Sequence, residues 1–199
     1  MDLKDLESIA ASCTLCDLHK GRIKAVFSKG NPNASTFICG MVPAHEENKV
    51  GIPFVGKAGQ LLDVIMAEAG FDMHNVYITN LVKCCLSPGL KLEQNWIDHC
   101  FPYLLSQIRM IRPSVIIALG ADAANTILGN EKRVALKHLR KVQQYNDYTS
   151  IICTYHPSYL LRGGGQNHKD YSNVIKDFEL ARTIVWSDPE ARWYNAVNL

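Results

Sequence analysis

The chain has 199 residues, of which 47% are hydrophobic and 20% are charged, a balance typical of one folded domain with a sizeable core. Its net charge of +2 does not by itself indicate a nucleic-acid partner, so such a footprint has to come from local clusters of basic residues. No apolar run approaches the roughly 18 residues of a membrane span, and the first residues lack a signal-peptide core, so we expect a cytoplasmic protein with no membrane partner.

Short apolar runs alternate with amphipathic stretches along the chain. Leu3, Leu6 and Ile9 recur at helical spacing and predict an amino-terminal helix that stops at Cys13. The predicted strands are residues 34–40, 75–82, 114–120 and 149–155, and the later predicted helices are residues 58–70, 92–111, 121–129 and 170–186. Strands that alternate with helices pair in parallel through right-handed crossovers, so the pattern predicts an α/β fold.

The loop from Gly40 to Leu62 follows the first predicted strand and is punctuated by glycine and proline. Ligands of open α/β sheets bind at the carboxyl ends of the strands, where this loop begins. Gly40 permits close approach of the backbone to a ligand, and Phe54 has a ring face to offer to a flat one. We therefore expect the ligand site here.

The chain contains seven cysteines, and four of them form two distant pairs. Their spacing suits a tetrahedral zinc ion or an iron-sulfur cluster and does not choose between them. The second pair also fits a pair of ordinary buried side chains, and Cys85 is able to replace Cys84. Cys39 and Cys153 lie in apolar strand runs, which favours a core role. The candidate ligands are Cys13, Cys16, Cys84 and Cys100.

Five segments together resemble the family 4 uracil-DNA glycosylases. They are CTLC (13–16), GIPFVGKAGQLL (51–62), TNLVKC (79–84) with a cysteine 16 residues later, IIALG (116–120) and TYHPSYLLR (154–162). The resemblance implies a three-layer α/β/α sandwich around a four-stranded parallel sheet, forming a single domain over residues 1–199. It also implies a structural iron-sulfur cluster and a site that hydrolyses the N-glycosidic bond of a flipped base.

The resemblance assigns roles to the candidate residues. It favours a [4Fe-4S] cluster over zinc on the four cysteines. Phe54 would stack on the base, with Gly40 and Met41 beside it, and Asn80 would hydrogen-bond to the pyrimidine edge. His156 would donate a hydrogen bond to the carbonyl oxygen of the leaving base, where negative charge develops. Without the motif context, Asn80 also fits a turn residue and His156 a structural one.

The resemblance further implies DNA as partner, single- or double-stranded, for a monomeric enzyme. Leu160, Leu161 and Arg162 would form a wedge that fills the gap left by the extruded base. Lys83 and Arg140 would contact phosphates, the latter within the basic run 132–141. The alternatives are a helix start with buried leucines and a solvated basic face.

One motif departs from the family. Family 4 members read Gly-Glu-Ala-Pro-Gly after the first strand, whereas this chain reads GMVPA, which is closer to the GLAPA loop of family 5. Met41 cannot act as a base, and Glu47 lies approximately where family members have an acidic residue. We expect a monofunctional glycosylase for uracil or a modified pyrimidine. The alternatives are a catalytically weak or silent module that binds damaged DNA, and a glycosylase for hypermodified bases of foreign DNA such as that of phages.

Overall fold

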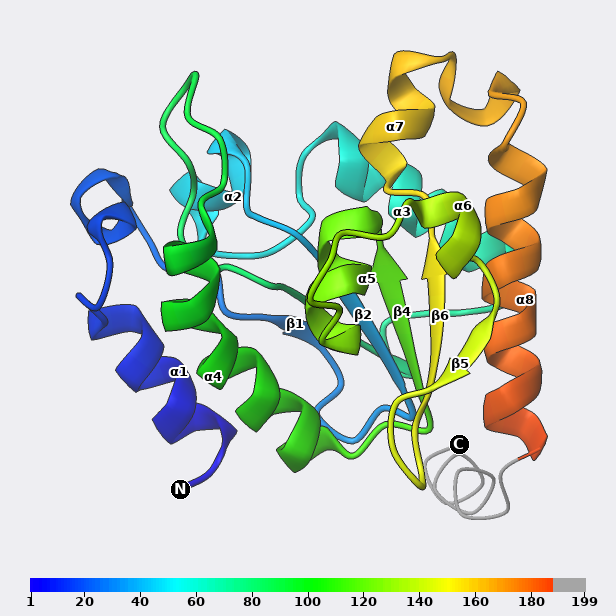
Figure 1. Ribbon diagram of the computed structural model, residues 1–199, viewed down its shortest axis with the longest axis horizontal. Helices are drawn as coiled ribbons and strands as arrows, with labels where there is room; N and C mark the ends of the chain where they lie inside the picture. Colours follow the sequence, from blue (N-terminus) through cyan, green and yellow to red (C-terminus); the bar gives the residue numbers. More distant parts are fainter. Residues whose placement is uncertain (188–199) are drawn as a thin grey trace.

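The computed structural model describes residues 1–187, so the predicted domain of residues 1–199 extends beyond the described part. Its centre is a six-stranded sheet in the order β1-β3-β2-β4-β6-β5 (Figure 1). The strands are β1 (Lys29–Gly30), β2 (Thr36–Gly40), β3 (Val76–Asn80), β4 (Val115–Leu119), β5 (Val142–Gln144) and β6 (Ser150–Thr154). The four predicted strands are all present as β2, β3, β4 and β6.

The sheet is mixed. The four central strands pair in parallel, while β1 and β5 are added to the two edges in antiparallel orientation. The sheet therefore differs from the four-stranded parallel one that we expected. The edge strands are only two and three residues long and read KG and VQQ, so they carry no apolar run that would reveal them in the sequence.

Eight α-helices occur in residues 1–187. They are α1 (Leu3–Ser12), α2 (His45–Val50), α3 (Lys57–Glu68), α4 (Gln94–Ile111), α5 (Ala121–Leu128), α6 (Leu136–Leu139), α7 (Pro157–Arg162) and α8 (Tyr171–Ser187). Two 3-10 turns, η1 (Asp17–Gly21) and η2 (Gly165–Asn167), complete the elements. Every predicted helix is present. The additional helices α2, α6 and α7 have six residues or fewer, too short to show a period.

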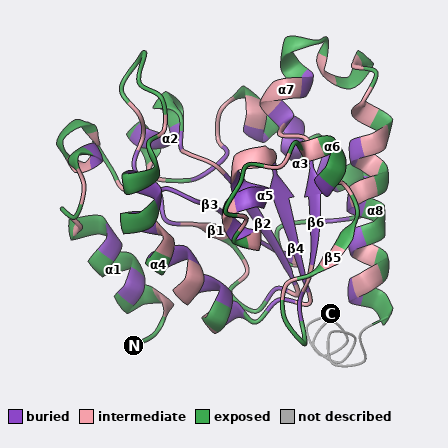
Figure 2. Cartoon of the chain, in the orientation of Figure 1, coloured by how far each residue is buried: buried purple, intermediate pink, exposed green. Residues whose placement is uncertain are grey.

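Helices cover both faces of the sheet because side chains alternate along each strand. On β2, Phe37 and Cys39 belong to the cluster that α1, α4 and α5 bury, whereas Ile38 belongs to the cluster that α3 and α8 bury. The four central strands are accordingly buried apart from the half-buried Ser150, whereas the edge strands β1 and β5 carry exposed residues, as do the outer sides of the helices (Figure 2). None of the helices in the described part is long and apolar enough to cross a membrane.

The parallel strands end together at one edge, and this positions the site. Gly40 at the end of β2 is in register with Asn80 at the end of β3. In Figure 1 the arrowheads of β4 and β6 point to this edge, where α2 and α7 also lie. The predicted ligand loop and the predicted wedge therefore flank the same end of the sheet.

Candidate active site and cysteine cavity

Gly40 lies at the centre of the site because its missing side chain leaves room for two others. A Cβ atom at this position would collide with the Asn80 amide oxygen and would lie 2.6 Å from Phe54 Cζ. Any larger residue would push the amide and the ring apart. The structure thus brings together Gly40, Phe54 and Asn80, as the sequence predicts.

Phe54 is held in an unusual backbone conformation. Its φ of 54° lies in the left-handed region, which is rare for a bulky residue and persists only where the surroundings enforce it. Two neighbours do so: Lys29 Nζ donates to the Phe54 carbonyl oxygen at 3.0 Å, and Gly59 packs so closely that a side chain there would collide with the same carbonyl. Phe54 itself is 5% exposed, so its ring is fixed in place before any ligand binds.

Glu47 also fixes this loop. Its carboxylate is buried and accepts hydrogen bonds from the backbone N–H groups of Ala44 (3.1 Å), Val55 (2.9 Å) and Gly56 (2.8 Å). Both oxygens are therefore engaged with the chain on either side of Phe54. This geometry favours a role in shaping the loop, and the catalytic role of Glu47 stays a prediction.

His156 is the N-cap of α7 and follows β6 closely. Its Nδ1 accepts the backbone N–H of Ser158 at 3.1 Å and lies 2.8 Å from the Ser158 hydroxyl. Because the Ser158 N–H can only donate, the proton of the neutral imidazole resides on Nε2. Burial, with Arg162 nearby, lowers the pKa of His156 from 6.5 to about 4, so the ring is a neutral Nε2–H donor at neutral pH.

The Asn80 amide faces the same space. The residue is 2% exposed, and within residues 1–187 its amide makes no hydrogen bond. In this part of the chain, Thr36 Oγ1 is the only fully enclosed side-chain polar atom that lacks a hydrogen-bond partner. The unbonded Asn80 amide is therefore not fully enclosed. An amide with both a free donor and a free acceptor at a sheet edge is suited to read a polar ring edge.

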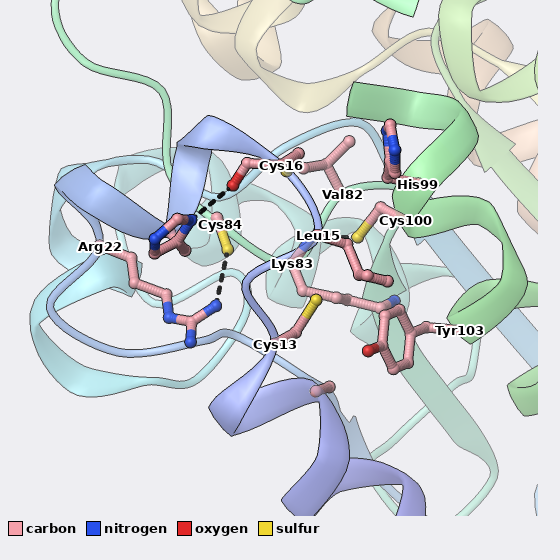
Figure 3. Close-up of a pocket in the computed structure, with 12 residues that line it drawn as sticks. Cys13, Leu15, Cys16, Arg22, Val82, Lys83, Cys84, His99, Cys100 and Tyr103 are labelled. Atoms are coloured by element: carbon pink, nitrogen blue, oxygen red, sulfur yellow. Dashed lines mark hydrogen bonds between the residues drawn. The ribbon is translucent and has the colours of Figure 1, made fainter. Parts of the chain in front are cut away.

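The four predicted cysteine ligands line one cavity (Figure 3). The cavity lies between the end of α1, helix α4 and the segment that follows β3. Its wall also includes Arg22, Lys83 and Tyr103. Cys84 lines this cavity, whereas Cys85 does not and donates its thiol to the carbonyl of Leu86. The structure therefore selects Cys84 over Cys85 as the fourth member of the group.

The donor set is one that an iron-sulfur cluster or a zinc ion takes, since cysteine thiolates hold both. Among the described residues, no three Cys, His, Asp or Glu side chains converge closely enough to hold one metal ion. Two hydrogen bonds also reach the sulfur atoms, from Arg22 Nη1 to Cys84 Sγ (3.4 Å) and from the Lys83 N–H to Cys100 Sγ (3.2 Å).

Cys39 and Cys153 are core residues, as predicted. Both are 0% exposed within strands, and burial raises the pKa of each thiol to about 12. Neither lines the cysteine cavity.

The structure contradicts two of the predicted DNA contacts, those of Lys83 and Leu160, and the contact of Arg140 stays a prediction. Lys83 is 2% exposed and its ammonium is bonded inside the protein, so it cannot reach a phosphate. Leu160 is 0% exposed in the core beneath α7, which leaves it unavailable as a wedge. Arg140 is paired with Asp177 at 2.8 Å and lies over the ring of Tyr155, so its guanidinium is committed to holding α8.

Leu161 and Arg162 are exposed on α7, and their contact with DNA stays a prediction. Met41 is half-buried and lines a separate cavity of about 730 Å³ between α4, α5 and the 86–94 segment. That cavity does not include Phe54, Asn80 or His156 in its wall. Met41 thus follows Gly40 in the chain and lines the neighbouring cavity.

Sequence reasoning missed two supporting residues, Lys29 and Ser158. Lys29 has no signal in the sequence, because only its position in β1 brings it to Phe54. Ser158 had a detectable signal, since a serine two residues after a helix-capping histidine is placed to bond back to the imidazole.

Comparison with known proteins identifies relatives. The model of the family described as "Uracil DNA glycosylase superfamily" matches residues 27–179. A Type-4 uracil-DNA glycosylase of Thermotoga maritima is 35% identical over 173 residues, which cover 87% of this chain and 89% of that protein. A Type-4 enzyme of Pyrobaculum aerophilum is 34% identical, covering 81% of this chain and 86% of its own. A Type-5 enzyme of the same organism is 28% identical, with 66% and 64% covered.

Proposed function

Because the chain belongs to the uracil-DNA glycosylase superfamily, we propose that it is a monofunctional DNA glycosylase that hydrolyses the N-glycosidic bond of a flipped uracil or modified pyrimidine. The observation that carries this proposal is the gathering of Phe54, Asn80 and His156 around Gly40 at the carboxyl edge of the sheet. Relatives with Type-4 names support uracil as the base to test first.

Each side chain has a defined part in the proposed reaction. The base stacks on the Phe54 ring and its polar edge pairs with the Asn80 amide. As the glycosidic bond breaks, electrons pass to the base, and its carbonyl oxygen becomes an anion. The neutral His156 donates its Nε2–H to that oxygen, which stabilises the leaving group without first needing a positive charge.

Departure of the base before attack by water reduces the need for a general base. Met41 has no proton-accepting group, and the nearby carboxylate of Glu47 is occupied by backbone N–H groups. The sugar cation is stabilised by the phosphates of the DNA. The Asn80 amide is the polar side chain that orients the attacking water in this proposal. Release of the base leaves an abasic site.

We further propose that Cys13, Cys16, Cys84 and Cys100 hold a [4Fe-4S] cluster, with zinc as the less favoured occupant. In this fold the cluster would cross-link the end of α1, helix α4 and the segment after β3, since its ligands come from these three places. The proposal places the enzyme with cellular DNA in the cytoplasm, acting as a monomer on one flipped base at a time.

The test is base release from oligonucleotides that carry uracil, 5-hydroxymethyluracil, hypoxanthine or a hypermodified pyrimidine, scored by alkaline cleavage at the abasic site. Uracil release supports the principal proposal. Release of only the hypermodified base would instead support an enzyme directed at foreign DNA, and binding without release would indicate a silent module.

Substitution Met41→Glu refines the substrate. A carboxylate at this position should raise uracil excision relative to that of 5-substituted bases, because it restores the water-positioning group that family 4 members have there. An unchanged preference would contradict a specificity role for Met41. Val42→Ala, next in the chain, is the control for a general loosening of the loop.

A further inference from the structure

Lys83 carries a buried ammonium group between the cysteine cavity and the end of β3. Its Nζ donates to Thr79 Oγ1 (2.7 Å), to the Asn80 carbonyl oxygen (2.6 Å) and to Gln107 Oε1 (2.7 Å). These bonds use all three donors of an ammonium group. Lys83 is therefore held like a core residue, and its conformation is coupled to that of Asn80.

The three acceptors are neutral oxygens. Within residues 1–187 no carboxylate forms an ion pair with Lys83, although burying a charge without an opposite one is strongly unfavourable. The groups that can face it with negative charge are sulfur atoms, and Cys100 lines the cysteine cavity together with Lys83 (Figure 3). Four thiolates around an iron-sulfur core carry a net negative charge, so the proposed cluster would supply the missing counter-charge.

The backbone joins the same two sites. The Lys83 N–H donates to Cys100 Sγ at 3.2 Å, and Cys84 is the next residue. Asn80 begins this short segment with a base-reading amide, and Cys84 ends it with a cysteine of the cavity. The Lys83 side chain folds back along the segment to the Asn80 carbonyl. Displacing either end would therefore move the other.

We propose that Lys83 is a positioning residue that couples the cysteine site to base recognition, holding the backbone of Asn80 with its ammonium while the cluster supplies the counter-charge. This inference rests on the proposed function and extends it by giving the cluster a link to the chemistry beyond cross-linking. Lys83 does not touch the base, and its effect passes through Asn80.

The kinetic test is a double-mutant cycle on single-turnover uracil release. Lys83→Met keeps the aliphatic stem and removes the three donors, and should lower the rate by about 10- to 100-fold, because a small misplacement of a positioning group has an effect of this size. In an Asn80→Ala background the same substitution should have almost no further effect. Equal losses in both backgrounds would overturn the coupling, as would a lowered melting temperature with an unchanged rate.

The electrostatic test does not depend on activity. Loss of a buried positive charge should shift the reduction potential of the cluster to a more negative value in Lys83→Met, at unchanged iron and sulfide content. Lys20→Met is the matched control, since Lys20 lies near Cys16 in the chain but is 68% exposed and paired with Asp17, so water screens its charge. Equal potentials in Lys83→Met and the wild type would overturn the proposal.

Failure of the inference and failure of the proposed function give different results. A wild type that releases no base refutes the proposed function, while the reduction potentials still decide the role of Lys83. If Lys83→Met does not fold, Thr79→Val removes one of the three acceptors at nearly constant volume. Its smaller loss of rate should likewise vanish in the Asn80→Ala background, and a loss that persists there contradicts the coupling.

Discussion

The ring of Phe54 lies 5.8 Å from the imidazole of His156, measured between ring centroids, and the two planes are inclined by 31°. The Phe54 ring comes from the loop after β2, the first of the four parallel strands in the chain. The His156 ring comes from the start of α7, which follows β6, the last of them. In the proposed complex, a flat base that stacks on Phe54 would lie within reach of His156. One residue would then bind the base while the other stabilises the charge that leaves with it.

Replacing the Phe54 ring should weaken base excision. Stacking of a base on an aromatic ring contributes about 1–3 kcal/mol, so Phe54→Leu should reduce single-turnover kcat/KM by roughly 5- to 150-fold. Phe54→Tyr is the matched control, since it keeps the ring and should retain most of the activity. A Phe54→Leu enzyme with wild-type kcat/KM would contradict the stacking role.

The neutral state of His156 predicts a flat pH profile. Because burial lowers its pKa to about 4, the ring keeps the same protonation state from pH 8 to pH 6, and kcat/KM should not change with an apparent pKa near 6.5. Ser158→Ala retains the backbone N–H bond to Nδ1 and should preserve this shape. A titration near 6.5 that disappears in His156→Gln would show that the imidazolium is the active form.

The same pKa affects stability. The folded-state pKa of His156 is below its ordinary value of 6.5, so the unfolded chain binds the proton more readily. This contribution to the free energy of unfolding is present above about pH 6.5 and is lost as the pH falls toward 4. Between pH 6.5 and 4, the free energy of unfolding measured in urea should fall less steeply with decreasing pH in His156→Gln than in the wild type. Equal slopes in the two proteins would contradict the lowered pKa of His156.

Glu47 should act on activity through the loop. Glu47→Gln replaces one acceptor oxygen by a donor that opposes the backbone N–H groups, and hydrogen bonds to a charged acceptor contribute about 1.5–3 kcal/mol each. We expect a lowered melting temperature together with reduced excision. Activity lost at full stability would instead support the catalytic role predicted from the sequence.

The paired cysteines 84 and 85 offer a direct test of the cluster. Cys84 lines the cavity and Cys85 does not, so Cys84→Ser should lose iron, acid-labile sulfide and brown colour, whereas Cys85→Ser should keep them. Absorbance and metal analysis of the purified proteins check both. A colourless wild type that contains stoichiometric zinc would favour the alternative metal, and equal losses in the two variants would contradict the selection of Cys84.

The sequence predicts the central elements well because buried strands are continuous apolar runs and the long helices have a clear period. β1 and β5 are short and polar, and only their partner strands define them. Helix α7 is similar: six residues do not reveal which side faces the core, so Leu160 and Leu161 look equivalent in the sequence although one is buried and the other exposed.

Charged residues are where the sequence misleads. Lys83 follows a strand and precedes a turn, a position typical of an exposed lysine, and its burial depends on acceptors that the fold brings from β3 and α4. Glu47 is recognisable as a carboxylate near the site, but its backbone partners become visible only when the loop closes on itself. The positions of the candidate residues Asn80 and His156 near strand ends were predictable because their motifs follow apolar strand runs.

The roles of His156 and Asn80 in base release are tested most directly by single-turnover release of uracil. The wild type, His156→Ala and Asn80→Ala are compared, each with verified fold and iron content. We predict rapid release by the wild type and a loss of two orders of magnitude or more in both variants, in keeping with removal of a donor that stabilises developing charge, which has an effect of about 100- to 1,000-fold. Full activity in both variants would contradict the assigned site.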